Sequence, residues 1–288
     1  MAIVDIVAFD DIPRINCFSL GDFHNFEKCF FGFLVKHHLQ KRYEIEEGNV
    51  NQTIGTLLDL VIKIIHRSKA YSQPLDYILT AIFKAAEGEI RDKVEKAGPQ
   101  SFYGGTIKFL NQENIDKAKE VFQSYYEKRK GKINQTILKE RFWDCILEGE
   151  EVFKIWGGPD ALELGEDGVP EIVDYKYFED PKRGKENLDM DLMPKLYTLL
   201  CAQELLKAGY SKARFRVISW TDPEDQSLYE EFDLESISLL KDFFKQKIQK
   251  ILSITEMSFC EKEYCKPCKS EQKEEWVKEL KIKGYIKT

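Results

Sequence analysis

The sequence has no hydrophobic run long enough to span a bilayer, which would need about eighteen consecutive apolar residues. Its first residues, MAIVDIVAFDD, carry acids and lack the basic stretch that opens a signal peptide. Internal repeats and low-complexity segments are also missing. With 288 residues, 43% of them hydrophobic, we expect a globular cytoplasmic protein that buries a sizeable core and has no membrane partner.

Positive charge is in short supply, because 43 Lys and Arg face 50 Asp and Glu, for a net charge of −7. Proteins that bind nucleic acids neutralise phosphates, so this balance favours an ordinary acidic protein unless basic residues gather on one face. Two basic runs occur, at residues 128–132 and at Lys182, Arg183 and Lys185. The second run follows an acidic segment discussed below and is placed to touch a substrate, although each run also suits a solvated surface.

Histidine is scarce as well, and none of His24, His37, His38 and His66 is spaced from a cysteine as metal ligands are. The seven cysteines are an odd number, which in a cytosolic chain indicates metal ligands and free thiols rather than a disulfide framework. Three of them, Cys17, Cys145 and Cys201, suit core packing. The others include the spaced group Cys260-x4-Cys265-x2-Cys268, which fits zinc as well as iron.

Hydrophobic spacing predicts several helices and strands. A break is expected at AGPQSFYGG (97–105), and Gly209 is expected to end a helix. The predicted helices cover 18–40, 52–66, 73–94, 113–133, 189–207 and 233–254, and the predicted strands lie near 151–157, 171–178, 213–220 and 227–232.

Two adjacent strand-like segments, WGGPDALEL and EIVDYKYF, are joined by a turn and predict a hairpin. We expect the first strand to end at Asp160, with thirteen residues between it and Asp174. Residues i and i+2 share one face of a strand, so Asp174 and Lys176 point the same way. Paired strands lie about 5 Å apart, so Asp160 can lie opposite them.

This pattern suits the cleavage of phosphodiesters, which needs a hard divalent cation held by carboxylates beside a group that positions the attacking water. In a chain with 32% charged residues, however, an acid-x-Lys triplet alone often marks a solvated strand face. Three features favour the catalytic interpretation: the apolar Ile172 and Val173, the upstream GGPD turn, and the helix expected after the hairpin.

The combination of Pro159-Asp160 with Asp174-x-Lys176 resembles the motif of PD-(D/E)XK nucleases in the form used by RecB-like members. Four further segments resemble parts of that family in the same order. They are FSLGDFHNFEKCFFGFLVKHH (its opening helix), GTLLD at 55–59 (its Gly-Thr-x-x-His segment), LMPKLYTLLCAQELL (its Gln-x-x-x-Tyr helix) and FCEKEYCKPC (the cysteine cluster of iron–sulfur members such as AddB and the CRISPR-associated nucleases).

The resemblance implies an α/β fold with a restriction-endonuclease-like core, in which a central mixed sheet is flanked by helices, plus a helical insertion over the cleft. Three segments are expected: residues 1–66 with the N-terminal helices of the nuclease domain, residues 67–140 as the insertion, and residues 141–288 with the nuclease core and the cysteines.

The resemblance also implies roles for individual residues. Asp160 and Asp174 are expected to bind Mg²⁺ or Mn²⁺ with the carbonyl of Tyr175, while Lys176 orients or deprotonates water or stabilises developing charge. Asp59 stands where many relatives have His, and a carboxylate can also bind these ions.

Substrate contacts are expected from Tyr197, Lys182 and Arg183, where Tyr197 equally suits the edge of the core. Met193 stands where relatives carry Gln. The implied substrate is DNA, with single-stranded ends digested by an exonuclease of repair, recombination or CRISPR adaptation. A helicase or a CRISPR-adaptation protein is the implied partner.

The resemblance pairs one early cysteine with three late ones, so Cys29, Cys260, Cys265 and Cys268 are expected to bind a [4Fe–4S] cluster, with Zn²⁺ as the alternative. Two other functions stay open at this point. One is a catalytically inactive DNA-binding module that has kept the nuclease fold, and the other is a zinc-binding interaction protein.

Overall fold

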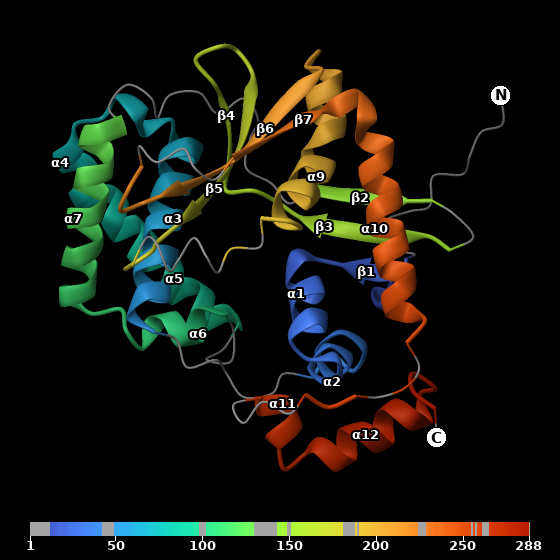
Figure 1. Cartoon of the computed structure of the whole chain (residues 1–288). Helices are drawn as coiled ribbons and strands as arrows, with labels where there is room; N and C mark the ends of the chain where they lie inside the picture. The colour runs from blue at the N-terminus through green and yellow to red at the C-terminus, as the bar shows by residue number, and fades with distance from the viewer. Residues whose placement is uncertain are drawn as a thin grey trace. The chain divides into compact units, whose positions relative to one another are not determined.

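The structure is a computed structural model in which the chain divides into two compact units (Figure 1). The first unit comprises residues 1–44, 142–157 and 236–288, and the second unit comprises residues 45–141 and 158–235. The structure describes residues 12–41, 49–97, 102–129, 143–148, 151–180, 188, 190–223, 229–254, 256, 258–260 and 265–287.

The second unit contains a mixed four-stranded sheet in the order β4-β5-β6-β7. Strand β5 (Pro170–Lys176) pairs antiparallel with β4 (Ala161–Leu164) and parallel with β6 (Lys212–Ser219). Strand β7 (Tyr229–Asp233) adds antiparallel to β6. Parallel neighbours need a crossover, which here contains α9 (Met193–Lys207). Gly209, with φ of 89°, follows α9 as expected of a residue that ends a helix.

Most of the second unit's helices precede its sheet. They are α3 (Val50–Ser68), η4 (Ala70–Ser72), α4 (Leu75–Tyr77), the π-helical η5 (Ile78–Ile82), α5 (Phe83–Ala97), α6 (Phe102–Ile107) and α7 (Gln112–Arg129). The helices predicted over 52–66 and 73–94 are confirmed with shifted ends. The helix predicted over 113–133 is confirmed up to Arg129, and residues 130–133 lie outside the described residues. The expected break at 97–105 is partly wrong, because α6 begins inside it.

These helices share a hydrophobic core with one face of the sheet. Figure 1 shows α3 and α7 side by side, and their buried residues pack with Val173, Tyr175 and Ile218 from the strands. Trp220, which follows β6, is fully buried in the same cluster. The helices described within residues 67–97 and 102–129 therefore pack on the sheet that carries the acidic motif, while the boundaries 1–66, 67–140 and 141–288 stay a prediction.

The first unit contains a three-stranded sheet in the order β1-β3-β2, formed by β1 (Cys17–Phe18), β3 (Phe153–Gly157) and β2 (Trp143–Leu147). Strand β3 is parallel to β1 and antiparallel to β2. Its helical elements are η2 (Arg14–Asn16), α1 (Leu20–Lys28), α2 (Phe30–Phe33), the π-helical η3 (Leu34–His38), α10 (Ile237–Leu252), α11 (Lys266–Lys269) and α12 (Lys273–Ile282), and η6 (Leu234–Ser236) leads into α10.

The single helix expected over 18–40 is wrong, because the chain leaves the helical conformation at Cys29. This residue is extended, with φ of −164° and ψ of 110°, and its sulfur accepts the Gly32 N–H at the start of α2. The preceding helix α1 begins at Ser19, which forms a capping box with Asp22. The break directs the sulfur of Cys29 to the start of the next helix rather than along a continuous helix face.

Mixed sheets flanked by helices confirm the expected α/β class and agree with a restriction-endonuclease-like fold. Among the helices in the described ranges, none is long and apolar enough to cross a membrane.

Candidate metal-dependent nuclease site

The acidic hairpin is formed by β4 and β5, and its first strand begins after Asp160 rather than ending there. The expected strand end is therefore wrong. The physical reason lies in Gly157 and Pro159: Gly157 ends β3 with φ of 151°, and Pro159 has no N–H to donate to a ladder. Asp160 is the first residue after Pro159 with an N–H, which donates to the carbonyl of Val173 over 3.0 Å.

Asp174 and Lys176 lie on β5 between two partner strands, with the spacing that places them on one face. The Lys176 Nζ lies 2.6 Å from Oδ2 of Asp174. Asp174 is only 2% exposed. The structure thus brings together the two residues that the sequence assigned to one strand face.

Asp160 is held against the same strand by the backbone. Its Oδ2 accepts the N–H of Tyr175 over 2.8 Å, and its Oδ1 lies 3.5 Å from Nζ of Lys63. A carboxylate fixed by a backbone donor keeps its orientation without relying on a flexible side chain. Asp160 therefore faces Lys63 of α3 with one oxygen and β5 with the other.

Asp59 joins the site from α3, where its Oδ1 accepts the indole N–H of Trp220 over 3.4 Å. Burial, followed by the nearby carboxylate of Asp160, raises the pKa of Asp59 well above its ordinary value. Lys176 and Lys63 act in the opposite direction. The carboxyl groups of α3, the hairpin and β5 thus interact electrostatically with one another.

Electrostatics also distinguish Asp174 and Lys176, the ion pair on β5. Burial raises the pKa of Asp174 to about 6, although the neighbouring Lys176 ammonium partly offsets this rise. Burial acts to lower the pKa of Lys176, but the carboxylates of Asp174 and Asp160 outweigh it and raise that pKa. Lys176 is therefore a cation at neutral pH in this arrangement, and the Asp174 carboxylate takes up a proton as the pH falls through about 6.

Among the expected substrate contacts, Tyr197 reaches this region from α9. Burial and then the charge of Asp174 raise its phenol pKa, and its ring centroid lies 6.0 Å from that of Phe215. The phenol is therefore both a neighbour of the acidic site and a packing residue. Lys182 and Arg183 lie outside the described residues.

The sequence interpretation missed Lys63, although a signal for it was present. Residues four apart on a helix share a face, and Lys63 follows Asp59 by one turn of α3. The other basic run turns out to be partly structural: Arg129 is 7% exposed and forms an ion pair of 3.3 Å with Glu163.

The opposite face of β5 is anchored by a buried polar network. The Tyr175 hydroxyl donates to Oε1 of Glu163 over 2.6 Å, and the Tyr125 hydroxyl donates to that of Tyr175 over 3.2 Å. Burial and then the Glu163 carboxylate raise the pKa of Tyr175, so its phenol stays protonated and donates. The side chain of Tyr175 thus holds the strand whose backbone holds Asp160.

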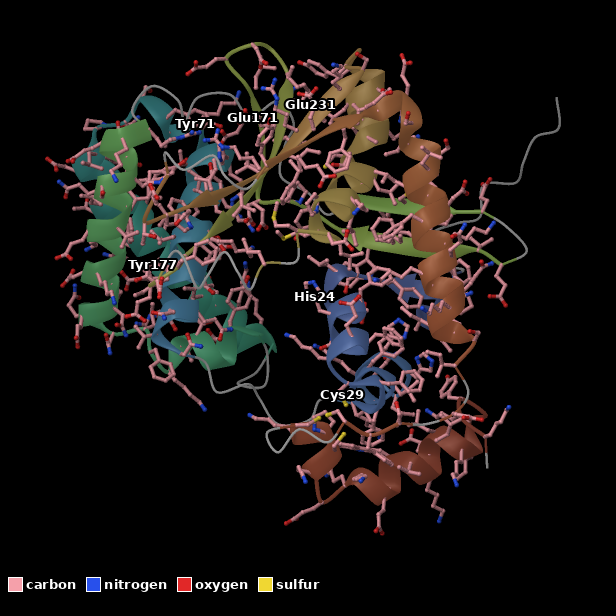
Figure 2. The ribbon with its side chains drawn as sticks, in the orientation of Figure 1. His24, Cys29, Tyr71, Glu171, Tyr177 and Glu231 are labelled. Atoms are coloured by element: carbon pink, nitrogen blue, oxygen red, sulfur yellow. The ribbon has the colours of Figure 1, made fainter. Side chains whose placement is uncertain are left out.

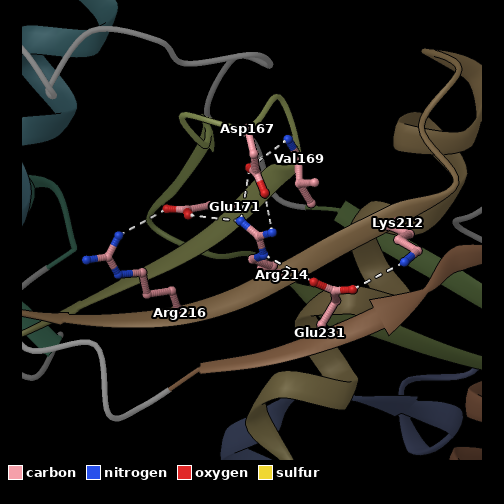
Figure 3. Close-up of polar contacts among 7 residues, drawn as sticks. All are labelled: Asp167, Val169, Glu171, Lys212, Arg214, Arg216 and Glu231. Carbon is pink, nitrogen blue, oxygen red and sulfur yellow. Dashed lines mark hydrogen bonds and ion pairs between the residues drawn. The ribbon is translucent and has the colours of Figure 1, made fainter.

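Ion pairs continue along the sheet away from this network (Figure 3). Arg216 lies 3.2 Å from Glu171, and Arg214 lies 3.2 Å from Glu231 and also pairs with Asp167 in the β4–β5 turn. The more exposed pairs of Arg214 contribute modestly to stability, typically about 0–1 kcal/mol each, while Arg216 and Glu171 are largely buried. They connect the strands in register without contacting the acidic site.

A four-cysteine cluster is present in the first unit. The sulfur atoms of Cys29, Cys260, Cys265 and Cys268 all lie within 4.8 Å of one another, and Figure 2 shows yellow sulfur atoms beside Cys29. Cys29 Sγ is 3.5 Å and Cys260 Sγ is 3.9 Å from Cys268 Sγ. Burial raises the pKa of Cys265 to about 11. Four converging thiols, three of them buried, fit a thiophilic metal centre, whose positive charge favours the thiolates.

A comparison with protein families matches residues 18–272 to the PD-(D/E)XK nuclease superfamily. Because this match covers most of the chain, the protein belongs to the PD-(D/E)XK nuclease superfamily, whose members are generally metal-dependent nucleases.

Comparison with curated proteins finds no match. Among solved structures, the chain is similar to one described as "Crystal structure of SSO0001", at 12% identity over 76% of this chain and 84% of that chain. The TM-score of 0.23 is low, so the family assignment rests on the sequence match.

Proposed function

We propose that this protein is a Mg²⁺- or Mn²⁺-dependent deoxyribonuclease that cleaves phosphodiester bonds at the site formed by Asp160, Asp174 and Lys176. The observation that carries the proposal is the pairing of two aspartates with two lysines around β5, at 2.6 Å and 3.5 Å. Carboxylate oxygens are the ligands that these hard cations prefer. The superfamily match supports the same class of reaction.

In this proposal Asp160, Asp174 and Asp59 would hold the metal, with the carbonyl of Tyr175 as a further ligand by family resemblance. The bound cation supplies Lewis acidity toward the phosphate and lowers the pKa of a bound water. Lys176, which is a cation beside Asp174, orients the attacking water and stabilises the negative charge that develops on the phosphoryl oxygens.

We infer single-stranded DNA ends as the substrate and an exonuclease as the activity. The resemblance to RecB-like nucleases supports this inference, as does Tyr197, an aromatic group next to the acidic site on which a base can stack. The basic residues Lys182 and Arg183 are proposed to bind the backbone of the same strand.

For the cysteine cluster, the resemblance supports a [4Fe–4S] cluster, while the sulfur spacing favours a single Zn²⁺. A tetrahedral ion with Zn–S bonds of about 2.3 Å places its sulfurs about 3.8 Å apart. The separations of 3.5 Å and 3.9 Å are close to that value, and a cubane with separate corner irons needs its sulfurs farther apart. To distinguish a [4Fe–4S] cluster from Zn²⁺, we would measure the iron and zinc content and the visible absorption of anaerobically purified protein. Bound Zn²⁺ is colourless, whereas an iron–sulfur cluster absorbs visible light.

The experiment for the activity uses single-stranded oligonucleotides labelled at either end, linear or circular, with Mn²⁺. The proposal predicts shortening of linear strands and no cleavage of circles. Cleavage of circles would replace the exonuclease with an endonuclease at the same site. Binding without cleavage under every metal condition would favour the inactive DNA-binding module, for which Met193 in place of Gln is the supporting observation.

A further inference from the structure

Lys63 is placed among the groups that would hold the metal. It lies on α3 one turn after Asp59, and its Nζ is 3.5 Å from Oδ1 of Asp160. Its side chain is 26% exposed, so the ammonium is partly removed from water. Its charge acts to lower the pKa of both Asp59 and Asp174, which places it near all three acids.

The two oxygens of Asp160 have different surroundings. Oδ2 accepts the backbone N–H of Tyr175 over 2.8 Å, so the strand itself fixes it, while Oδ1 faces the Lys63 ammonium. A divalent cation bound by Asp160 therefore competes with Lys63 for negative charge on Oδ1. If the metal draws the Asp160 carboxylate away, the partly buried Lys63 ammonium is stabilised by a new anionic partner.

We propose that Lys63 binds a backbone phosphate of the nucleic-acid substrate beside the scissile bond, exchanging Asp160 for that phosphate when the metal is bound. This inference rests on the proposed nuclease function. The chemistry fits a phosphodiester, which carries one negative charge and offers two exposed oxygens. A lysine ammonium binds such a phosphate as a compact positive charge.

The charge balance of the site supports the exchange. When all three acids are ionised, as metal ligands are, their three negative charges and the two ammonium groups leave one net negative charge, whereas burial favours the neutral form of Asp59 in the metal-free site. A divalent cation changes this to one net positive charge, so that substrate is attracted after the metal is bound. Without Lys63 the metal-bound site would be neutral, and the attraction for the phosphate would be weaker.

A competing account gives Lys63 only the task of balancing Asp160 in the absence of metal. Under that account, Lys63→Met tightens Mn²⁺ binding and leaves DNA binding unchanged. Under the proposal, Lys63→Met weakens DNA binding and makes DNA affinity less dependent on salt. Each phosphate contact to a single strand contributes about 0.7 to the slope of log affinity against log salt concentration.

The test measures binding of a fluorescent single-stranded oligonucleotide in Ca²⁺ across NaCl concentrations, and cleavage kcat and KM in Mn²⁺. We compare wild type with Lys63→Met, Lys63→Gln and Lys63→Arg, and use Lys84→Met, an exposed position on α5, as the control for loss of one charge. Thermal melting identifies which variants are folded. If Lys63→Met does not fold, Lys63→Gln takes its place in the comparison.

The expected result is a roughly tenfold rise in Kd and KM for Lys63→Met and a slope lowered by about 0.7, with wild-type slopes for Lys63→Arg and Lys84→Met. A wild-type slope in folded Lys63→Met and Lys63→Gln overturns the inference while leaving the nuclease proposal intact. A wild type that binds DNA with the Lys63-dependent slope but never cleaves it overturns only the nuclease proposal. A wild type that neither binds nor cleaves DNA overturns both.

Discussion

At the scale of single residues, the site pairs its acids with lysines that have different surroundings. Lys176 lies 2.6 Å from Asp174, which is almost fully buried, and Lys63 lies 3.5 Å from the more exposed Asp160. Electrostatic interactions are stronger in buried surroundings, where water screens less. The pair on β5 is therefore the one that we expect to control the chemical step.

Replacing Lys176 should remove activity without removing the metal. Lys176→Met keeps the apolar stem but loses the ammonium that stabilises charge in the transition state, so we expect kcat to fall by about 10³-fold or more. Mn²⁺ affinity measured by calorimetry should stay equal or rise, because a competing cation is gone. Lys84→Met is the control, and substantial turnover by Lys176→Met would contradict the assigned role.

Metal affinity should depend on pH through Asp174. Since its pKa is about 6 in the metal-free site, Mn²⁺ must displace a proton below that pH, and affinity should fall as pH falls from 7.5 to 5. Calorimetry in buffers of differing ionisation enthalpy should detect the released proton. An affinity that is flat across this range would contradict the burial that raises the pKa.

The raised pKa of Asp174 should also affect the stability of the metal-free protein. An acid whose pKa is higher in the folded state than in the unfolded state lowers stability as pH rises between the two values, here from about 4 to about 6. In EDTA at pH 7.5, Asp174→Asn should therefore be more stable than wild type, by an amount on the order of 1 kcal/mol. The difference should vanish near pH 4, with the exposed Asp92→Asn as the control in urea unfolding.

At the scale of elements, β5 serves the site through both of its faces. Its backbone N–H at Tyr175 orients Asp160, and the Tyr175 side chain on the other face donates to buried Glu163. Helix α3 brings Asp59 and Lys63 to the same region. The position of one strand thus sets the geometry of several of the proposed metal ligands.

Removing the Tyr175 hydroxyl should test this anchor. Tyr175→Phe leaves the buried Glu163 carboxylate without its 2.6 Å donor, so the free energy of unfolding should fall by about 1–3 kcal/mol. A double-mutant cycle with Glu163→Gln, measured by urea unfolding, should give a coupling of at least about 0.5 kcal/mol. Additive effects of the two substitutions would mean that the bond contributes nothing.

The sequence predicted the acid-x-Lys face because the side-chain period of two is imposed by any strand. It failed at Asp160 because hydrophobic spacing could not show that Gly157 and Pro159 separate two strands belonging to different sheets. It also failed at Cys29, where apolar residues on both sides continue a helical pattern while the backbone becomes extended. Strand ends and helix breaks depend on hydrogen bonds to distant residues, which periodicity alone does not contain.

At the scale of the whole chain, the cysteine cluster joins residues that are far apart in sequence. A metal bound by Cys29 and Cys260 closes a loop of more than two hundred residues, where restriction of the unfolded chain is in principle largest. The late cysteines lie in a Lys-rich segment, although Phe31 and Trp276 do pack there, with ring centroids 6.4 Å apart. We therefore expect metal to stabilise this segment.

Loss of one cysteine should release the metal and loosen that segment together. Cys29→Ala and Cys268→Ala should each lose most bound iron or zinc, measured by elemental analysis of protein prepared without oxygen. Limited proteolysis should then cut faster after Ile254. Cys145→Ala, which removes a thiol of the same unit outside the cluster, should change neither result. Full metal content in Cys29→Ala would show that the first ligand is wrongly assigned.

We propose above that Asp160, Asp174 and Lys176 form a metal-dependent nuclease site. The most direct measurement is degradation of an end-labelled single-stranded oligonucleotide by wild type and Asp174→Asn, in Mn²⁺, in Mg²⁺ and in EDTA. The account predicts cleavage by wild type that EDTA abolishes and added Mn²⁺ restores, and activity at least about 10³-fold lower in the folded variant. Undiminished cleavage in EDTA, or by purified Asp174→Asn, would contradict it.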